Sequence, residues 1–257
     1  MYERDLAVVF DGSIEGFLSI VYAHYYDKIM PANIQVEGMY QNSLDAEEYY
    51  VPTDFDKASK VQQGIRRKIS SQAEHYISYA FLTEGEDKYM DMFRYLVLGF
   101  KMGRSVDCYL QEDYVLAVHK MARYVGREAH LLTGFCRFAE TKQGVFYCSI
   151  SPKNKVLPIL AEHFSDRMMN QAWIIHDKGR RLAAVYDGES YMIGQVPDEV
   201  NIEYADKEKQ VQDLWKVFFS SVSIKERESK KRHRNVLPLY FRKSMLEFMP
   251  PKKSKGK

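Results

Sequence analysis

The stretch GFCRFAETKQGVFYCSIS (134–151) contains two runs of strand-like composition around a polar Lys142-Gln143 turn. Its apolar positions recur with a period of two, which is typical of strands, so a β-hairpin is predicted. Further along, a helical apolar spacing over residues 157–168 predicts a helix with Pro158 in its first turn. Three more β-rich runs follow: AWIIHD (172–177), RLAAVYD (181–187) and SYMIGQV (190–196). Residues 134–197 therefore predict a hairpin, a helix and a three-stranded meander.

The first half of the chain is predicted to be mainly helical. A short apolar strand, Leu6–Phe10, ends in Asp11-Gly12, but one glycine is too little for a nucleotide-binding fingerprint. The exposed side of the second helix is locally basic, through Arg66, Arg67 and Lys68. Helical spacing predicts four helices, at residues 14–29, 61–80, 89–97 (ending near Gly99 or Gly103) and 115–132 (ending at Gly134).

The C-terminal region predicts two more helices. The first covers residues 211–222, and we expect its Trp215 and Phe218 to lie in the core because they share the apolar stripe. The second is short, around residues 238–248. The predicted fold class is therefore α+β: N-terminal strand and helices (1–86), an α+β domain with C-terminal helices (87–250), and a disordered basic tail (251–257).

Composition predicts a soluble, cytoplasmic protein. The start of the chain, MYERDLAVVF, is unlike a secretory signal, and no run of about 18 apolar residues suggests a membrane span. The three cysteines, Cys108, Cys136 and Cys148, have no CxxC spacing and apolar neighbours, so they predict reduced, mostly buried thiols. They cannot supply an iron–sulfur cluster on this chain alone, and the sequence predicts neither a metal site nor a cofactor.

Positive charge is concentrated near the C-terminus. The net charge is only +2, but residues 225–257 hold twelve lysines and arginines against three acids. Basic residues flanked by aromatic ones suit nucleic acid, so phosphate contact is predicted here. The predicted contacts are Lys225, Arg227, Lys230, Lys231, Arg232 and Arg234, extended by Arg242 and Lys243.

Candidate catalytic groups are His163, Arg167 and His176. His163 and Arg167 are four residues apart, so they share a helix face and can point together at a phosphate, although His163 also borders the apolar stripe. His176-Asp177 ends a predicted strand and precedes several basic residues, yet adjacent strand residues point to opposite faces, and Asp177-Lys178-Gly179 is also a plain turn signal.

Several short motifs recur together along the chain. They are Phe10-Asp11-Gly12, Thr53-Asp54, Arg127-Glu128-Ala129-His130, Gly134-Phe135, Arg137-Phe138, Leu157-Pro158, His163-Phe164 with Arg167, Trp173, Ile175-His176-Asp177 with Arg180 or Arg181, Leu214-Trp215, Phe218-Phe219, Ile224-Lys225 with Arg227, and Pro238. In this combination the chain resembles the bacterial probable DNA metabolism proteins, which carry a domain of unknown function. The resemblance marks Arg127, Glu128, His130, Arg137 and Asp177 as family-motif residues.

The resemblance implies work on DNA. Members of that family are encoded beside a putative DNA repair or modification radical SAM protein, and some are fused to a uracil-DNA glycosylase-like domain. The C-terminal block departs from the family pattern at Ser229-Lys230 and at Tyr240, Phe241 and Arg242, which favours binding over catalysis there.

Three functions follow as hypotheses. The first is a DNA-binding accessory of a radical SAM partner in DNA repair or modification. The second is a glycosylase- or nuclease-like enzyme with a histidine as general base, using His163, His176 and Arg167. The third is a structural subunit of a heterodimer without its own nucleic-acid site.

Overall fold

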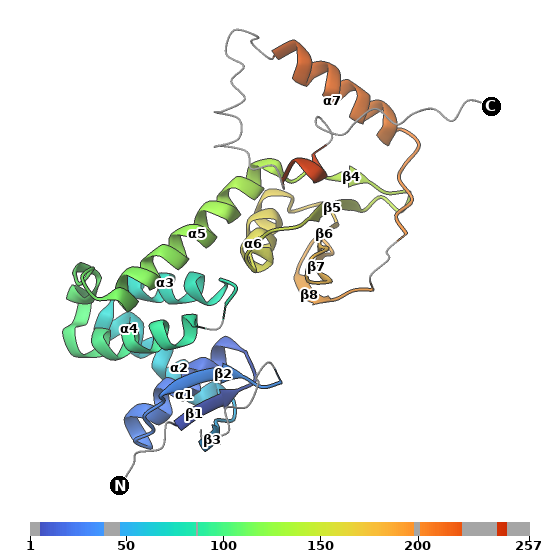
Figure 1. Cartoon of the computed structure of the whole chain (residues 1–257). Helices are drawn as coiled ribbons and strands as arrows, with labels where there is room; N and C mark the ends of the chain where they lie inside the picture. The colour runs from blue at the N-terminus through green and yellow to red at the C-terminus, as the bar shows by residue number, and fades with distance from the viewer. Residues whose placement is uncertain (1–5, 39–46, 86, 198–200, 223–240, 246–257) are drawn as a thin grey trace. The chain divides into compact units, whose positions relative to one another are not determined.

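The computed structural model describes residues 6–38, 47–85, 87–197, 201–222 and 241–245 and has an α+β fold (Figure 1). The chain divides into two compact units, an N-terminal unit (Met1–Gly126) and a C-terminal unit (Arg127–Lys257). Their boundary falls inside the long helix α5 (Asp113–Phe135), whereas the sequence suggested a division after residue 86.

The N-terminal unit contains a three-stranded parallel sheet in the order β2-β1-β3. The central strand is β1 (Leu6–Phe10), as predicted, flanked by β2 (Asn33–Val36) and β3 (Glu47–Tyr50). The two outer strands were not predicted, because each has only four residues and β3 (EEYY) is exposed throughout. Helix α1 (Ile14–Tyr26) connects β1 to β2 and is capped by Ser13, whose hydroxyl accepts a hydrogen bond from the Gly16 N–H at 2.9 Å.

The predicted second helix is broken in the structure, so the expectation of one helix from Val61 to Ala80 was wrong. Ser70 has an extended backbone (φ −171°, ψ 162°) and caps the next helix by accepting from the Ala73 N–H at 2.9 Å. A polar cap residue competes with helix continuation because its side chain satisfies the following N–H groups. The elements are α2 (Phe55–Gly64), the π-helix η1 (Ile65–Ile69) and α3 (Ser71–Phe81).

Two further helices contribute to the core of the N-terminal unit, to which the first turns of α5 also add Val115 and Val118. Helix α4 (Lys88–Met102) ends at Gly103, whose φ of 63° suits glycine, as the sequence predicted. The 3₁₀ helix η2 (Gly103–Cys108) follows and leaves Cys108 exposed, contrary to the expectation that the thiols are mostly buried.

The C-terminal unit is built on a five-stranded sheet in the order β4-β5-β6-β7-β8. The strands are β4 (Ala139–Glu140), β5 (Phe146–Ile150), β6 (Trp173–Asp177), β7 (Leu182–Tyr186) and β8 (Tyr191–Gln195). The antiparallel β4–β5 hairpin and the antiparallel β6-β7-β8 meander confirm the prediction. Helix α6 (Leu157–Arg167) joins the parallel strands β5 and β6. It packs on the sheet face that bears Trp173, since the Phe138 ring contacts both Phe164 of α6 (4.9 Å) and Trp173 (6.5 Å).

Helix α7 (Glu208–Val222) forms where predicted, but its apolar stripe is not core. Leu214 is 69% exposed, Phe218 is 55% exposed and Trp215 is 36% exposed. Amphipathic spacing shows only that a helix can bury one face, and these three side chains of the stripe remain exposed to solvent. Of the last predicted helix the structure describes the 3₁₀ turn η4 (Phe241–Ser244) and Met245. Within the described ranges, no helix has the length and apolarity to cross a membrane.

Candidate functional site

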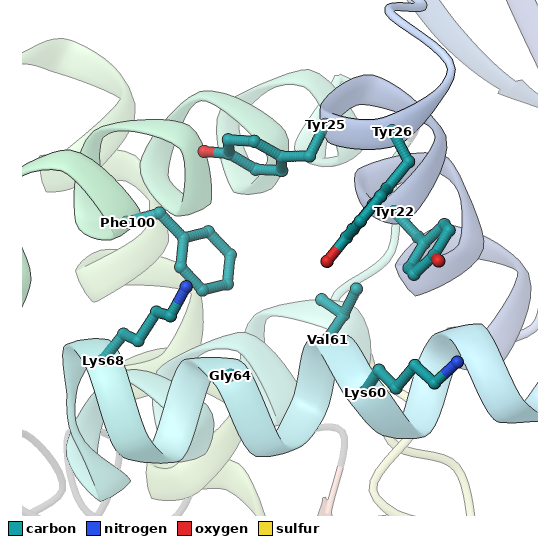
Figure 2. Close-up of a pocket in the computed structure, with 8 residues that line it drawn as sticks. All are labelled: Tyr22, Tyr25, Tyr26, Lys60, Val61, Gly64, Lys68 and Phe100. Atoms are coloured by element: carbon teal, nitrogen blue, oxygen red, sulfur yellow. The ribbon is translucent and has the colours of Figure 1, made fainter.

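An aromatic cavity of about 380 Å³ opens in the N-terminal unit (Figure 2). It is formed by helices α1, α2 and α4 and by the π-helix η1. Its lining is mainly aromatic and basic: Tyr22, Tyr25, Tyr26, Lys60, Val61, Gly64, Lys68 and Phe100. The volume lies within the range of pockets that hold small ligands or parts of larger ones, roughly 300–1,000 Å³.

The last turn of α1 supplies three of the rings. Tyr22, Tyr25 and Tyr26 are spaced i, i+3 and i+4, which places them on one side of the helix. The rings of Tyr22 and Tyr26 stack with centroids 4.2 Å apart, whereas Tyr25 meets Phe100 edge to face at 5.5 Å. Burial raises the pKa of Tyr25, so its hydroxyl is neutral at physiological pH. The Tyr26 side chain is 69% exposed. The rings therefore present an accessible stacking surface to solvent.

Gly64 of α2 faces the ring of Phe100. A Cβ atom at Gly64 would lie 3.4 Å from Cε1 of Phe100, which is ordinary van der Waals contact. The backbone at Gly64 is helical (φ −60°), so its conformation does not require glycine. The absence of a side chain at Gly64 leaves room in the cavity.

Positive charges line one side of the aromatic cavity and continue into a neighbouring hollow. That second hollow, of about 410 Å³, is lined by Lys60, Gln63, Gly64, Arg67 and Lys68. Neither lining includes a carboxylate, and among the described residues none of the three cations, Lys60, Arg67 and Lys68, forms an ion pair. We call the two hollows together the aromatic-basic surface.

Neighbouring cations are neutralised within the fold. Arg66 is paired with Glu74, with 2.6 Å between Nε and Oε2. Lys57 lies 3.8 Å from Asp54 and over the ring of Tyr22. Arg66 and Lys57 are thus paired with carboxylates, whereas the cations of the aromatic-basic surface have no such pair among the described residues.

The motif residues at the end of β1 and after β3 meet, but they satisfy one another. Asp11 Oδ2 accepts a hydrogen bond from the Thr53 hydroxyl at 2.8 Å, and Asp11 Oδ1 accepts from the Ser13 N–H and hydroxyl. Burial alone would raise the pKa of Asp11, but these hydrogen bonds together lower it. A Cβ atom at Gly16 would lie 2.4 Å from Asp11 Oδ1, so glycine there makes room for the network. Asp11 therefore acts as a structural carboxylate.

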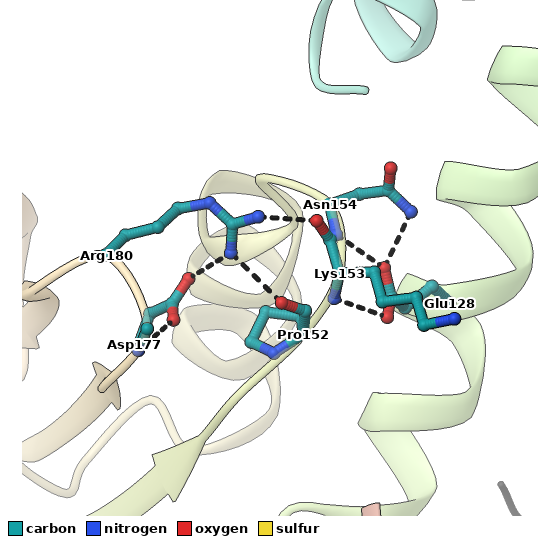
Figure 3. A network of polar contacts seen from close by, with 7 residues as sticks. Glu128, Pro152, Lys153, Asn154, Asp177 and Arg180 are labelled. Carbon is teal, nitrogen blue, oxygen red and sulfur yellow. Dashed lines mark hydrogen bonds and ion pairs between the residues drawn. The ribbon is translucent and has the colours of Figure 1, made fainter. Parts of the chain in front are cut away.

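The C-terminal unit brings other motif residues together around residues 151–156, which we call the β5–α6 loop (Figure 3). Glu128 of α5 is buried and accepts hydrogen bonds from the backbone N–H groups of Lys153 and Asn154, both at 2.9 Å. The side-chain amide of Asn154 donates a further bond to Glu128 at 2.7 Å. The carboxylate thereby ties α5 to the β5–α6 loop.

Asp177 and Arg180 hold the same loop from the side of β6 (Figure 3). Arg180 Nη1 donates to Asp177 Oδ2 at 2.8 Å and to the Pro152 carbonyl at 3.2 Å, while Nη2 donates to the Lys153 carbonyl at 2.5 Å. The Asp177 side chain is only 1% exposed. Glu128 thus holds the backbone of the β5–α6 loop directly, and Asp177 holds it through Arg180.

The three predicted catalytic residues have different surroundings. His176 is buried and its Nδ1 lies 2.8 Å from the Tyr147 hydroxyl. Side chains alternate along β6, so His176 points to the face opposite Trp173, whereas α6, which carries His163 and Arg167, packs on the Trp173 face. His163 and Arg167 are exposed. The structure therefore does not bring His163 and His176 together.

Burial sets the protonation of the His176 pair. Desolvation lowers the pKa of His176, helped by the nearby Lys178, against the opposing effect of Asp177. Burial also raises the pKa of Tyr147 to about 12, so its hydroxyl keeps its proton and can donate to a neutral imidazole.

The remaining predicted residues are scattered or lie outside the described residues. Arg127 and His130 are exposed on α5, and Arg137 donates to the Gly134 carbonyl at 2.8 Å and lies over the Trp215 ring. Arg242 is half-buried in η4. Outside the residues whose side chains are described lie Lys225, Arg227, Lys230, Lys231, Arg232, Arg234 and Lys243.

The sequence predicted only part of the basic half of the aromatic-basic surface. Arg67 and Lys68 belong to the predicted basic side at residues 66–68, whereas Lys60 was not singled out and the three tyrosines were included only in the helix predicted at residues 14–29. The available signal was the clustering of three tyrosines in one helical turn, because a core stripe seldom consists of polar-tipped aromatic rings alone.

Comparison with known proteins identifies a family. Among curated proteins no match was found. Within the described part of the chain, no group of three or more His, Cys, Asp or Glu residues is arranged to hold a metal ion. A family model described as a domain of unknown function (DUF4130) matches residues 86–247, which is more than half of the 257 residues. The chain therefore belongs to the DUF4130 family.

Proposed function

We propose that this protein binds DNA through the aromatic-basic surface and acts as an accessory in DNA repair or modification. The observation that carries the proposal is the set of three exposed cations, Lys60, Arg67 and Lys68, beside exposed aromatic rings, with no carboxylate among the described residues of either lining. Lysine and arginine that neutralise phosphates supply most of the sequence-independent affinity for DNA.

The geometry supports this binding mode physically. The cations lie along α2 and η1, and a series of positive groups along a helix can follow a phosphate backbone. Within the described part of the chain no carboxylate pairs with the three cations, so each can replace a counterion on the nucleic acid.

The resemblance to the probable DNA metabolism proteins supplies the biological context. It supports DNA as the target and a radical SAM protein as the partner that performs the chemistry. In this proposal the present chain positions DNA, and the partner supplies the reactive centre.

The proposal is tested by measuring DNA binding as a function of salt. In the variant Lys60→Ala/Arg67→Ala/Lys68→Ala, we expect weaker binding and a salt slope shallower by up to about 2–3, since each phosphate contact contributes roughly 0.7–0.9 to that slope. The matched control replaces the exposed cations Arg94, Lys120 and Arg123 and should keep the wild-type slope. Equal slopes for the two triple variants would contradict the proposal.

The basic segment Lys225–Arg234, which lies outside the described residues, is a second proposed contact. Replacing Lys230, Lys231, Arg232 and Arg234 by alanine measures its share by the same salt titration. An unchanged affinity and an unchanged salt slope would show that the segment does not contact DNA.

The partner is tested by co-expression with the neighbouring radical SAM protein. The accessory role is supported if the two proteins co-purify and if this chain, purified without the partner, binds DNA. Co-purification with DNA binding only by the partner would instead make this chain a structural subunit.

A further inference from the structure

We infer that the aromatic cavity holds an unpaired base, so that the DNA recognised by this protein is single-stranded or locally unpaired. This inference rests on the proposed DNA binding and specifies which form of DNA occupies the surface. It is carried by the arrangement of rings and cations around one hollow (Figure 2).

The rings offer flat apolar faces next to solvent. Tyr22 and Tyr26 stack with an interplanar angle of 13°, and Tyr26 remains 69% exposed although its ring is largely apolar. A base stacked on such a ring removes apolar surface of both partners from water. Tyr25 and Phe100, at 82° to each other, provide walls of different orientation around the hollow.

The cations line the same hollow as the rings and the hollow next to it, within reach of a phosphate that follows the base. Lys60 and Lys68 line both hollows, and Arg67 lines the second one only. A nucleotide combines a planar base with an anionic phosphate, so a chain of nucleotides can place a base in the aromatic cavity and phosphates along the cations. A peptide or lipid partner would need either acidic side chains in register or a larger apolar area.

A paired duplex cannot use the rings in this way. Its base faces are covered by stacking inside the helix, and only their edges reach the grooves. An aromatic cavity therefore adds affinity only for bases that are already unpaired or have been extruded.

The test compares single-stranded and duplex DNA by fluorescence anisotropy, with a 12-nucleotide oligothymidine and a mixed-sequence duplex as probes. Wild-type protein should prefer the single strand. Tyr26→Ala should weaken single-strand binding between about 5-fold and about 150-fold, the range measured for loss of one base–aromatic stack, and leave duplex binding unchanged. Tyr26→Phe, which keeps the ring, should restore single-strand binding.

The control variant is Tyr124→Ala, because Tyr124 is also an exposed tyrosine (57%) of the N-terminal unit but does not line the cavity. Circular dichroism melting of each variant verifies that it is folded. If Tyr26→Ala and Tyr124→Ala bind the single strand equally well while the triple lysine/arginine variant still loses DNA affinity, the cavity inference is overturned and the proposed function stands. If the wild-type protein binds neither probe, both are overturned.

Discussion

Glu128 and Asn154 are joined twice, through the backbone N–H of Asn154 at 2.9 Å and its side-chain amide at 2.7 Å, both to Oε2 of the carboxylate. Because Lys153 donates to the other oxygen, one buried glutamate satisfies three donors of the β5–α6 loop. This arrangement assigns the family-motif glutamate a structural role in the C-terminal unit.

Glu128→Gln should therefore destabilise the C-terminal unit by about 1–3 kcal/mol, because the amide nitrogen faces a backbone donor that it cannot accept from. Both tryptophans, Trp173 and Trp215, lie in this unit, so tryptophan fluorescence during urea unfolding reports on it. Glu162→Gln, on the exposed side of α6, is the control and should change the free energy of unfolding by less than about 0.5 kcal/mol. Equal stability of the two variants would show that the Glu128 network is dispensable.

Arg180→Met should destabilise the same unit by about 2–4 kcal/mol. The substitution leaves the Asp177 carboxylate, 1% exposed, without its cation, and the loss falls below that of a fully buried pair because Arg180 keeps 17% exposure. Arg180→Lys should recover part of the loss, since a lysine keeps the charge but cannot span Asp177 and both carbonyls at once. The matched control is Arg167→Met, at an exposed arginine of α6, and a similar urea midpoint for it and Arg180→Met would contradict the prediction.

The buried His176 should make stability fall at acidic pH. Desolvation and Lys178 lower its pKa in the folded state, so the contribution of the neutral imidazole is complete above the unfolded value of about 6.5 and is lost as pH falls through the folded value. Urea unfolding between pH 5 and 8 should show this loss in the wild type, and His176→Gln should flatten the profile. His163→Gln, at an exposed histidine, should leave the profile as steep as in the wild type.

Two helical glycines should respond in opposite directions to alanine. Gly64→Ala should stabilise the N-terminal unit by about 0.5–1 kcal/mol, because alanine is the better helix former and its Cβ meets Phe100 at an ordinary 3.4 Å. Gly16→Ala should instead destabilise it by about 1–3 kcal/mol, since the new Cβ would lie 2.4 Å from Asp11 Oδ1 and 2.8 Å from Thr53 Oγ1. Thermal unfolding followed by circular dichroism checks the opposite signs, and a shift in the same direction for both would refute the steric argument.

Strong periodic patterns predicted the larger elements correctly. The meander from Trp173 to Gln195 was predicted from β-rich runs separated by turn residues, and helix α5 from its helical apolar spacing. The break at Ser70 was missed, since the apolar stripe of Ile65, Ile69, Ala73 and Ile77 continues across it and spacing alone cannot detect a cap. The prediction that Trp215 and Phe218 of α7 lie in the core was wrong. Helical spacing shows that one face is apolar, but it does not show whether another element packs against that face.

The α+β class, most helices and the meander were predictable, because helical apolar spacing and β-rich runs between turn residues are local features of the chain. Which side chains meet depends on the tertiary structure. It joined Glu128 to Asn154 and Asp177 to Arg180 around one loop, placed His176 on the sheet face away from α6, and gathered rings from α1 and α4 with cations from α2 and η1. Such groupings depend on contacts between segments far apart in the chain, and no local spacing encodes them.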